Sequence, residues 1–232
     1  MIPLRDDQPR FSTPYVTYFL IGLNSAIFLF ESALTPESFK TLLFQFGMIS
    51  ANITGYLSAA SGPGLVAVLL PALTSMFLHG SWMHVIGNMW FLWIFGDNIE
   101  DHLGHFKYLV FYVASGLGAA FAQVILNPHS LVPTVGASGA IAGVLGAYFV
   151  LYPRARVLIL FPIFFLFYLP AWVTLGYWFA MQFLSGAATS IADYSDTRGG
   201  VAFWAHVGGF VAGIVLIKIL PERPRRYRYG TW

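Results

Sequence analysis

The sequence contains no cysteine and few charged residues. Only 9% of its 232 residues are charged, whereas about 25% of a soluble domain is charged. The lack of cysteine excludes disulfides, thiol nucleophiles and cysteine-ligated metals. The shortage of charge, beside 57% hydrophobic residues, indicates a chain whose main solvent is a lipid bilayer. The net charge of +2 is too small to indicate a nucleic-acid partner.

Several motifs of other enzyme classes are also missing. The chain has no His-Glu-x-x-His motif, so a zinc protease of that type lacks its ligands, and it has no phosphate-binding P-loop. Asp97 has no second membrane aspartate opposite it, which argues against a two-carboxylate protease. His102 and His105, near Glu100 and Asp101, resemble a metal cluster. Their place at the end of an apolar segment favours a solvated loop instead, so we expect no metal and no cofactor.

Long apolar segments are what the chain has in abundance. Each is close to the ~20 residues that a membrane helix needs. The predicted spans cover residues 15–35, 82–100, 107–127, 135–152, 170–188 and 202–220. The expected fold class is therefore all-α, a polytopic membrane bundle of six transmembrane helices. A single membrane domain over 15–220 would follow a short polar segment, 1–14, and precede a basic tail, 221–232.

Two further apolar stretches do not fit the pattern of a span. Residues 64–78 are too short and contain Pro71, so we expect a re-entrant or interfacial segment in the first loop, 36–78. Residues 157–169 lie in an apolar stretch divided by prolines, and we expect an interfacial connection there.

The distribution of basic residues predicts the orientation. In the six-span arrangement, Lys40 and Arg198 fall on one side of the membrane and the rest of the 12 basic residues fall on the other. Cytoplasmic loops carry an excess of Lys and Arg. Both termini are therefore expected to be cytoplasmic.

This orientation places three reactive side chains at a common depth. The second, fourth and sixth spans run from outside to inside, and His84, Ser138 and His206 lie near their starts. At 1.5 Å per residue, each lies about 5–10 Å below the outer surface. Ionisable groups inside a membrane usually face the bundle interior or a wet cavity and indicate function.

Glycines predict which of these helices pack closely. Gly-x-x-x-Gly pairs let helix backbones approach in lipid, and the two pairs here are Gly139/Gly143 and Gly209/Gly213. The second pair lies on the same helical face as His206. Packing the two faces together would bring His206 towards Ser138, although a glycine pair alone is more often plain helix packing.

A serine and a histidine in contact form a hydrolytic dyad. Ser138 is a weak nucleophile until a base takes its proton, and the neutral ring of His206 is the natural base. A carboxylate is not strictly required, so we interpret Asp193 and Asp196 as loop charges.

Negative charge that develops on a substrate oxygen needs hydrogen-bond donors. His84 and Asn88 lie four residues apart on one helical face and could supply them together with the backbone N–H of Ser138. The alternative for Asn88 is an ordinary helix–helix hydrogen bond, and a lone histidine in a span is often structural.

Three stretches, in this order, resemble the rhomboid intramembrane serine proteases. They are His79-Gly-Ser-Trp-Met-His84-Val-Ile-Gly-Asn88, Gly136-Ala-Ser138-Gly139 and His206-Val-Gly-Gly209-Phe-Val-Ala-Gly213. The resemblance covers about residues 74–220 and is to the bacterial and archaeal type with a six-span core. Two features depart from it. Ala142 stands where some members have a tyrosine stacked on the histidine, and the first loop has no Trp-Arg pair.

The resemblance implies a role for each of these residues. Ser138 would be the nucleophile and His206 the base, with Asn88 and His84 at the oxyanion site. His79 would be structural, and the motif glycines would serve helix packing: Gly136, Gly139, Gly143, Gly209 and Gly213. The fifth span and a cap loop near 190–200 would form the substrate gate.

The resemblance also implies what the protein acts on and where. Its partners would be membrane-protein substrates and the bilayer, without nucleic acid, in a prokaryotic inner membrane. The alternative is a non-catalytic rhomboid-like protein that binds membrane clients, and a transporter is a weaker rival. No oligomeric state is predicted.

Overall fold

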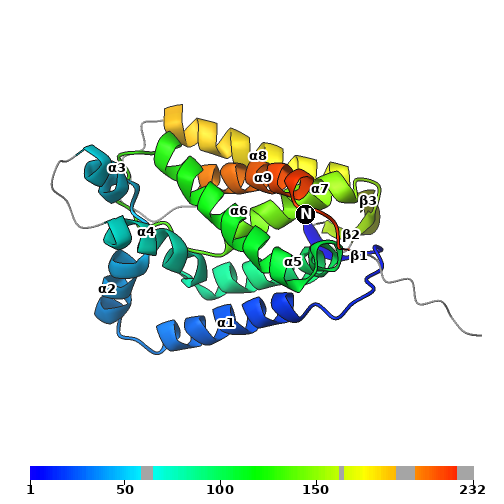
Figure 1. Cartoon of the computed structure of the whole chain (residues 1–232), viewed down its shortest axis with the longest axis horizontal. Helices are drawn as coiled ribbons and strands as arrows, with labels where there is room; N and C mark the ends of the chain where they lie inside the picture. Colours follow the sequence, from blue (N-terminus) through cyan, green and yellow to red (C-terminus); the bar gives the residue numbers. More distant parts are fainter. Residues whose placement is uncertain (59–64, 162–164, 192–201, 224–232) are drawn as a thin grey trace, which may run out of the picture.

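A computed structural model describes residues 1–58, 65–161, 165–191 and 202–223 (Figure 1). The helices in these residues are α1 (Tyr15–Ser32), α2 (Pro36–Phe46), α3 (Ser50–Ser58), α4 (Leu65–Thr74), the short 3₁₀ helix η1 (Ser75–Phe77), α5 (Trp82–Leu103), α6 (His105–Leu126), α7 (Ser138–Leu151), α8 (Ala171–Ile191) and α9 (Phe203–Ile219). The strands are β1 (Ile2–Asp6), β2 (Arg156–Phe161) and β3 (Phe165–Pro170).

Each of the six segments predicted as a span contains a helix, from 14 residues in α7 to 22 in α5 and α6. Local sequence explains several of the boundaries. The Ser81 side chain accepts a hydrogen bond from the backbone of His84 and begins α5. Gly104, with φ of 77°, separates α5 from α6. Among the described residues, α1 and α6 are long and apolar enough to cross a membrane, whereas α7 and α9 are apolar but shorter.

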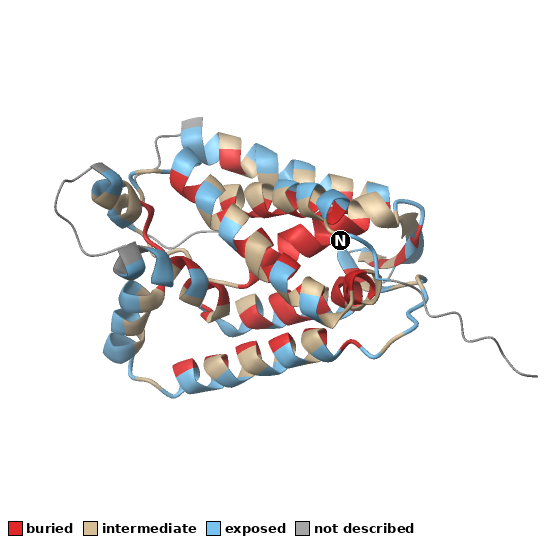
Figure 2. Ribbon diagram, viewed as in Figure 1, coloured by how far each residue is buried: buried red, intermediate tan, exposed pale blue. Residues whose placement is uncertain are grey.

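Helix α7 lies at the centre of the bundle, and every residue from Gly139 to Tyr148 is buried (Figure 2). Helix α9 packs directly against it through glycines. A Cβ atom added to Gly209 would lie 2.0 Å from the carbonyl oxygen of Gly139, and one added to Gly213 would lie 2.0 Å from that of Gly143. The close approach predicted from the two glycine pairs is therefore confirmed.

The connecting segments gather at opposite ends of the bundle. Helices α2, α3 and α4 of the first loop lie together at one end, and the three strands lie at the other (Figure 1). The expected re-entrant segment at 64–78 is a short helix, α4, followed by η1.

The expectation of an all-α fold is wrong at the second end. Strands β2 and β3 form an antiparallel hairpin, and β1 pairs with β2 as the third strand. Residues 157–169 were expected to be an interfacial connection, and the described parts of this range, 157–161 and 165–169, pair as strands of the sheet. Hydropathy did not reveal this because the partner strand, β1, comes from a polar segment more than 140 residues away.

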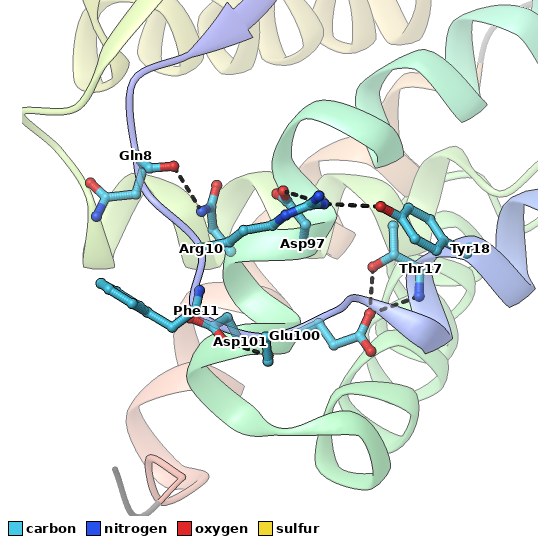
Figure 3. Close-up of polar contacts among 10 residues, drawn as sticks. Gln8, Arg10, Phe11, Thr17, Tyr18, Asp97, Glu100 and Asp101 are labelled. Atoms are coloured by element: carbon cyan, nitrogen blue, oxygen red, sulfur yellow. Dashed lines mark hydrogen bonds and ion pairs between the residues drawn. The ribbon is translucent and has the colours of Figure 1, made fainter. Parts of the chain in front are cut away.

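The expectation of a solvated loop at the end of α5 is also wrong. Glu100 is fully buried and accepts hydrogen bonds from the backbone N–H of Thr17 (2.8 Å), its hydroxyl (2.7 Å) and Nδ1 of His105 (2.6 Å). Asp101 accepts from the backbone N–H of Phe11 at 3.0 Å (Figure 3). Glu100 thus satisfies free N–H groups in the first turn of α1, which a helix start requires, whereas Asp101 binds the segment that precedes the helix.

Candidate active site

The hydroxyl of Ser138 and the ring of His206 are in direct contact. Ser138 Oγ lies 2.8 Å from His206 Nε2, a hydrogen-bond distance. Ser138 is the first residue of α7, and His206 lies in the first turn of α9. The glycine packing between the two helices makes this contact possible, because a bulkier interface would hold the two side chains apart.

The residue two positions before Ser138 must be a glycine. Gly136 has φ of +123°, a conformation that side-chain-bearing residues rarely adopt. A Cβ atom there would also lie 2.6 Å from Nε2 of His84. The backbone N–H of Gly136 donates to the carbonyl oxygen of Ser75 in η1 at 2.8 Å. The first loop therefore holds the turn that leads into Ser138.

The two predicted oxyanion residues lie beside this turn. His84 contacts the Gly136 position directly, and Asn88 Nδ2 lies 3.6 Å from the place where a Cβ of Gly136 would be. Helix α7 begins immediately afterwards. Its N-cap residue, Ala137, provides no side-chain hydrogen bond. The first-turn N–H groups of a helix have no intrahelical partner, so backbone and side-chain donors converge near Ser138.

His79 is a fully buried part of the same network. The Asn88 amide donates to His79 Nε2 at 3.0 Å. This bond uses one of the two N–H groups of the amide and leaves the second for another acceptor. The backbone N–H of His79 donates to the carboxylate of Glu31 at 3.2 Å. Glu31, in α1, was missed by the sequence analysis although a carboxylate inside an apolar segment is itself a signal.

Two side chains of α8 contact the His206 ring, and both were missed. Gln182 Oε1 lies 2.8 Å from Nδ1 of His206. The Trp178 ring lies one turn earlier on α8, with its centroid 5.7 Å from that of the histidine and the planes tilted by 34°. Ala142, the position that lacks the stacking tyrosine, is fully buried. The sequence signal that could have identified Gln182 is its polar amide within an apolar segment.

A small cavity adjoins the serine. Its volume of about 30 Å³ is lined by Ser138 and Gly136 on one side and by Met48 and Ser75 of the first loop on the other. Space of this size can hold a water molecule beside polar partners. Met48 is fixed by a two-way backbone bridge to Thr134, with N···O distances of 3.1 and 2.7 Å. The first loop thus contributes part of the lining of the cavity beside Ser138.

Part of the predicted gate lies outside the described residues. The cap loop near 190–200 and the loop charges Asp193 and Asp196 fall largely in the stretch 192–201. At the edge of this stretch, Trp204 Nε1 donates to the hydroxyl of Ser190 at 3.0 Å. Within the parts of the chain that are described, no group of three or more His, Asp or Glu side chains is arranged to hold a metal ion.

Comparison with known proteins gives the family. Residues 67–223 match the rhomboid domain. The mitochondrial rhomboid protein 1 of Saccharomyces cerevisiae is 27% identical over 228 residues, covering 94% of this chain and 58% of the yeast protein. The human mitochondrial presenilin-associated rhomboid-like protein is 30% identical over 162 residues, covering 66% of this chain and 38% of the human protein. The chloroplastic rhomboid-like protein 11 of Arabidopsis thaliana is 31% identical over 165 residues, covering 66% and 52%.

The match covers only part of each relative. The chain spans between 38% and 58% of their lengths. They are organellar proteins, so the similarity does not single out the bacterial and archaeal type expected from the motifs. Since the domain match extends over more than half of the chain, the chain belongs to the rhomboid family and is an integral membrane protein.

Proposed function

We propose that this protein is an intramembrane serine endopeptidase that cleaves transmembrane or juxtamembrane segments of other membrane proteins. The observation that carries the proposal is the 2.8 Å contact between Ser138 Oγ and His206 Nε2. A hydroxyl and an imidazole in contact are a nucleophile and its general base. The family and the resemblance of the motifs to rhomboid proteases support the same reaction.

The dyad would work by proton transfer through His206. The ring takes the proton of Ser138 as the oxygen attacks the scissile carbonyl, and it returns this proton to the leaving amine. The product is an acyl-enzyme on Ser138. Water then attacks the ester with the same ring as base and releases the second product. The cavity beside Ser138 is large enough for that water.

Donors near Gly136 would stabilise the negative charge that develops on the carbonyl oxygen. The second N–H of Asn88, the ring of His84 and the backbone N–H of Ser138 form the proposed oxyanion site. Donors fixed in a site of low dielectric cost little reorganisation during the reaction, and each is worth several kcal/mol to the transition state.

The membrane arrangement that fits this function has six spans: α1, α5, α6, α7, α8 and α9. With the basic residues concentrated at the sheet end and the tail, both termini would lie in the cytoplasm of a prokaryotic cell. Ser138 would then lie below the outer leaflet. Substrates whose helices unwind readily would be preferred, because a helix hides its carbonyls in hydrogen bonds.

A client-binding rhomboid-like protein without catalysis is the alternative. Such a protein needs the fold and the glycine packing but not a serine in contact with a histidine. The presence of that contact favours the protease.

Replacing either reacting residue tests the proposal. We expect Ser138→Ala and His206→Ala to lower kcat on a membrane reporter substrate by a factor on the order of 10⁴ or more. A fluorophosphonate should label the wild type and not the Ser138→Ala variant. Matched controls are Ser115→Ala, a buried hydroxyl in α6, and His129→Ala, an exposed loop histidine. Undiminished cleavage by either dyad variant would contradict the mechanism, and client binding without any cleavage would favour the alternative.

A further inference from the structure

We propose that Gln182 is a positioning residue that holds His206 in the tautomer and orientation required by Ser138. The inference rests on the proposed protease function and adds a third residue to the dyad. It comes from α8, a helix that contributes none of the motif residues.

The two hydrogen bonds of the ring fix where its proton lies. The side-chain oxygen of Gln182 lies 2.8 Å from Nδ1, and the hydroxyl of Ser138 lies 2.8 Å from Nε2. With the carbonyl oxygen of Gln182 facing the ring, Nδ1 carries the ring proton, because a carbonyl oxygen only accepts hydrogen bonds. Nε2 then has its lone pair free to take the proton of Ser138. The opposite tautomer would donate to the serine and could not act as its base.

Trp178 restricts the same ring from another direction. It lies four residues before Gln182 and therefore on the same face of α8. Its ring centroid is 5.7 Å from that of His206. The imidazole is thus held at one nitrogen by an amide and packs against a tilted indole ring. This arrangement accounts for how the ring is oriented without a tyrosine at position 142.

A neutral amide suits this place better than a carboxylate would. Burying a carboxylate at membrane depth carries a large desolvation cost, whereas a paired amide carries little. The carbonyl dipole of Gln182 still favours the ring when it becomes positively charged in the transition state. A hydrogen bond to a charged ring is about twice as strong as one to a neutral ring. The interaction with Gln182 therefore strengthens as the reaction proceeds, which is the condition for raising kcat.

Two substitutions at this position separate a positioning role from a structural one. Gln182→Leu keeps the approximate size and removes the acceptor, and we expect kcat to fall about 10- to 100-fold with little change in KM. Gln182→Glu restores an acceptor and should recover part of the rate lost in Gln182→Leu, although its carboxylate costs more to bury than the amide. Because a carboxylate stabilises the protonated ring, the acidic limb of its pH–rate profile should move to higher pH. A purely structural role of Gln182 predicts instead that a folded Gln182→Leu variant keeps the kcat of the wild type.

The matched control is Gln123→Leu, the same change at a buried glutamine in α6. We expect its kcat and pH profile to stay close to those of the wild type. Thermal unfolding in detergent reports whether each variant is folded. If Gln182→Leu does not fold, the comparison of Gln182→Glu with the wild type carries the test, and an unmoved acidic limb overturns the proposal.

The outcome distinguishes this inference from the proposed function. Serine-dependent cleavage by the wild type, together with a folded Gln182→Leu variant of unchanged kcat and pH profile, overturns the role of Gln182 and leaves the protease intact. A wild type that neither cleaves a substrate nor reacts with a fluorophosphonate overturns the protease first. The expected result is a reactive wild type, a slow leucine variant and a partly rescued glutamate variant.

Discussion

Two amide side chains near the dyad form hydrogen bonds without a fixed charge. Gln182 accepts from His206, and the amide of Asn88 donates to His79 beside the turn that contains Gly136. A paired neutral group costs little to bury, whereas a fixed charge at the same depth is expensive. Single substitutions among these residues should therefore change the reaction rate more than the stability of the fold.

Asn88 is the most direct test of this expectation. Removing one oxyanion donor typically costs about 10²–10³ in kcat, and we expect a loss of this size for Asn88→Ala with a modest change in KM. Steady-state cleavage of a membrane reporter measures both constants. Asn24→Ala is a suitable control, because Asn24 is buried in α1 and donates to the carbonyl of Leu20 at 2.7 Å. If Asn88→Ala retains the full rate, its bond to His79 is purely structural.

At the scale of helices, the packing of α7 against α9 brings Ser138 and His206 into contact. Gly209 and Gly213 lie against the carbonyl groups of Gly139 and Gly143, so the backbones are separated by no side chain. Helices in lipid gain stability from such close packing rather than from the hydrophobic effect. The distance between the serine and the histidine is therefore set by the backbones, and it is sensitive to one added methyl group.

Gly209→Ala should disturb this interface strongly. Its Cβ would lie 2.0 Å from a backbone oxygen, which cannot rotate away. We expect a loss of about 1–3 kcal/mol in stability from overpacking and a larger fall in cleavage, since α9 must shift with His206. Thermal unfolding and reporter cleavage measure the two effects.

Gly22→Ala in α1 provides the contrast. A Cβ there meets nothing within 4 Å, and alanine favours a helix over glycine by roughly 0.5–1 kcal/mol. The variant should be as active as the wild type and slightly more stable. Equal behaviour of the two variants would show that the glycine interface does not set the geometry of the site.

In the whole molecule, the Ser138–His206 pair is separate from the polar contacts of the N-terminal segment. The first loop lies at one end of the bundle and the sheet at the other (Figure 1), and Ser138 shares a cavity with Met48 and Ser75 of the first loop. Tyr148, near the end of α7, donates to Asp6 in β1. Arg156 in β2 pairs with Asp7 at 2.9 Å, and Arg10 lies 3.7 Å from Asp97. These contacts tie the N-terminal segment to the bundle far from the dyad.

This polar end should make stability depend on pH. Burial raises the pKa of Asp6 to about 6, partly offset by the hydrogen bond from Tyr148. The folded state therefore holds this proton more tightly than the unfolded state. The contribution of Asp6 to stability falls as pH rises from about 4 to about 6 and is constant above. Asp6→Asn should remove this fall, so the variant gains stability relative to the wild type at pH 7 but not at pH 4.

Asp7→Asn serves as a control, because its expected effect on stability at pH 7 is opposite to that of Asp6→Asn. Burial acts to raise the pKa of Asp7, but hydrogen bonds from Arg156 outweigh it and lower the pKa. The stabilising contribution of Asp7 is present above its unfolded pKa and is lost in acid. The Asp7→Asn variant should be slightly less stable than the wild type at pH 7 and equally stable in strong acid. The loss at pH 7 is small because the ion pair is exposed. Unfolding midpoints across this pH range that fail to separate the two variants would contradict the assignment.

Hydropathy and motif spacing were sufficient to predict the helices that carry the site. Membrane helices need long apolar segments, and a Gly-x-x-x-Gly pair marks a close interface, so both leave a local pattern in the chain. The same patterns predicted that Ser138 and His206 would meet. Glu31 and Gln182 carried a detectable signal as well, since each is a polar side chain within an apolar segment.

The hydrogen-bond partners of those polar residues could be identified only from the three-dimensional structure. Gln182 reaches His206, Glu31 reaches the backbone of His79, and Glu100 reaches the start of α1, each across a gap of more than 20 positions in the chain. Strand β1 likewise pairs with β2, although it lies more than 140 positions earlier in the chain. A hydrogen bond between distant segments depends on helix rotation and depth, which no local pattern encodes. Short motifs in the sequence therefore predict the proposed nucleophile and base, whereas the residues that contact them were identified only in the folded bundle.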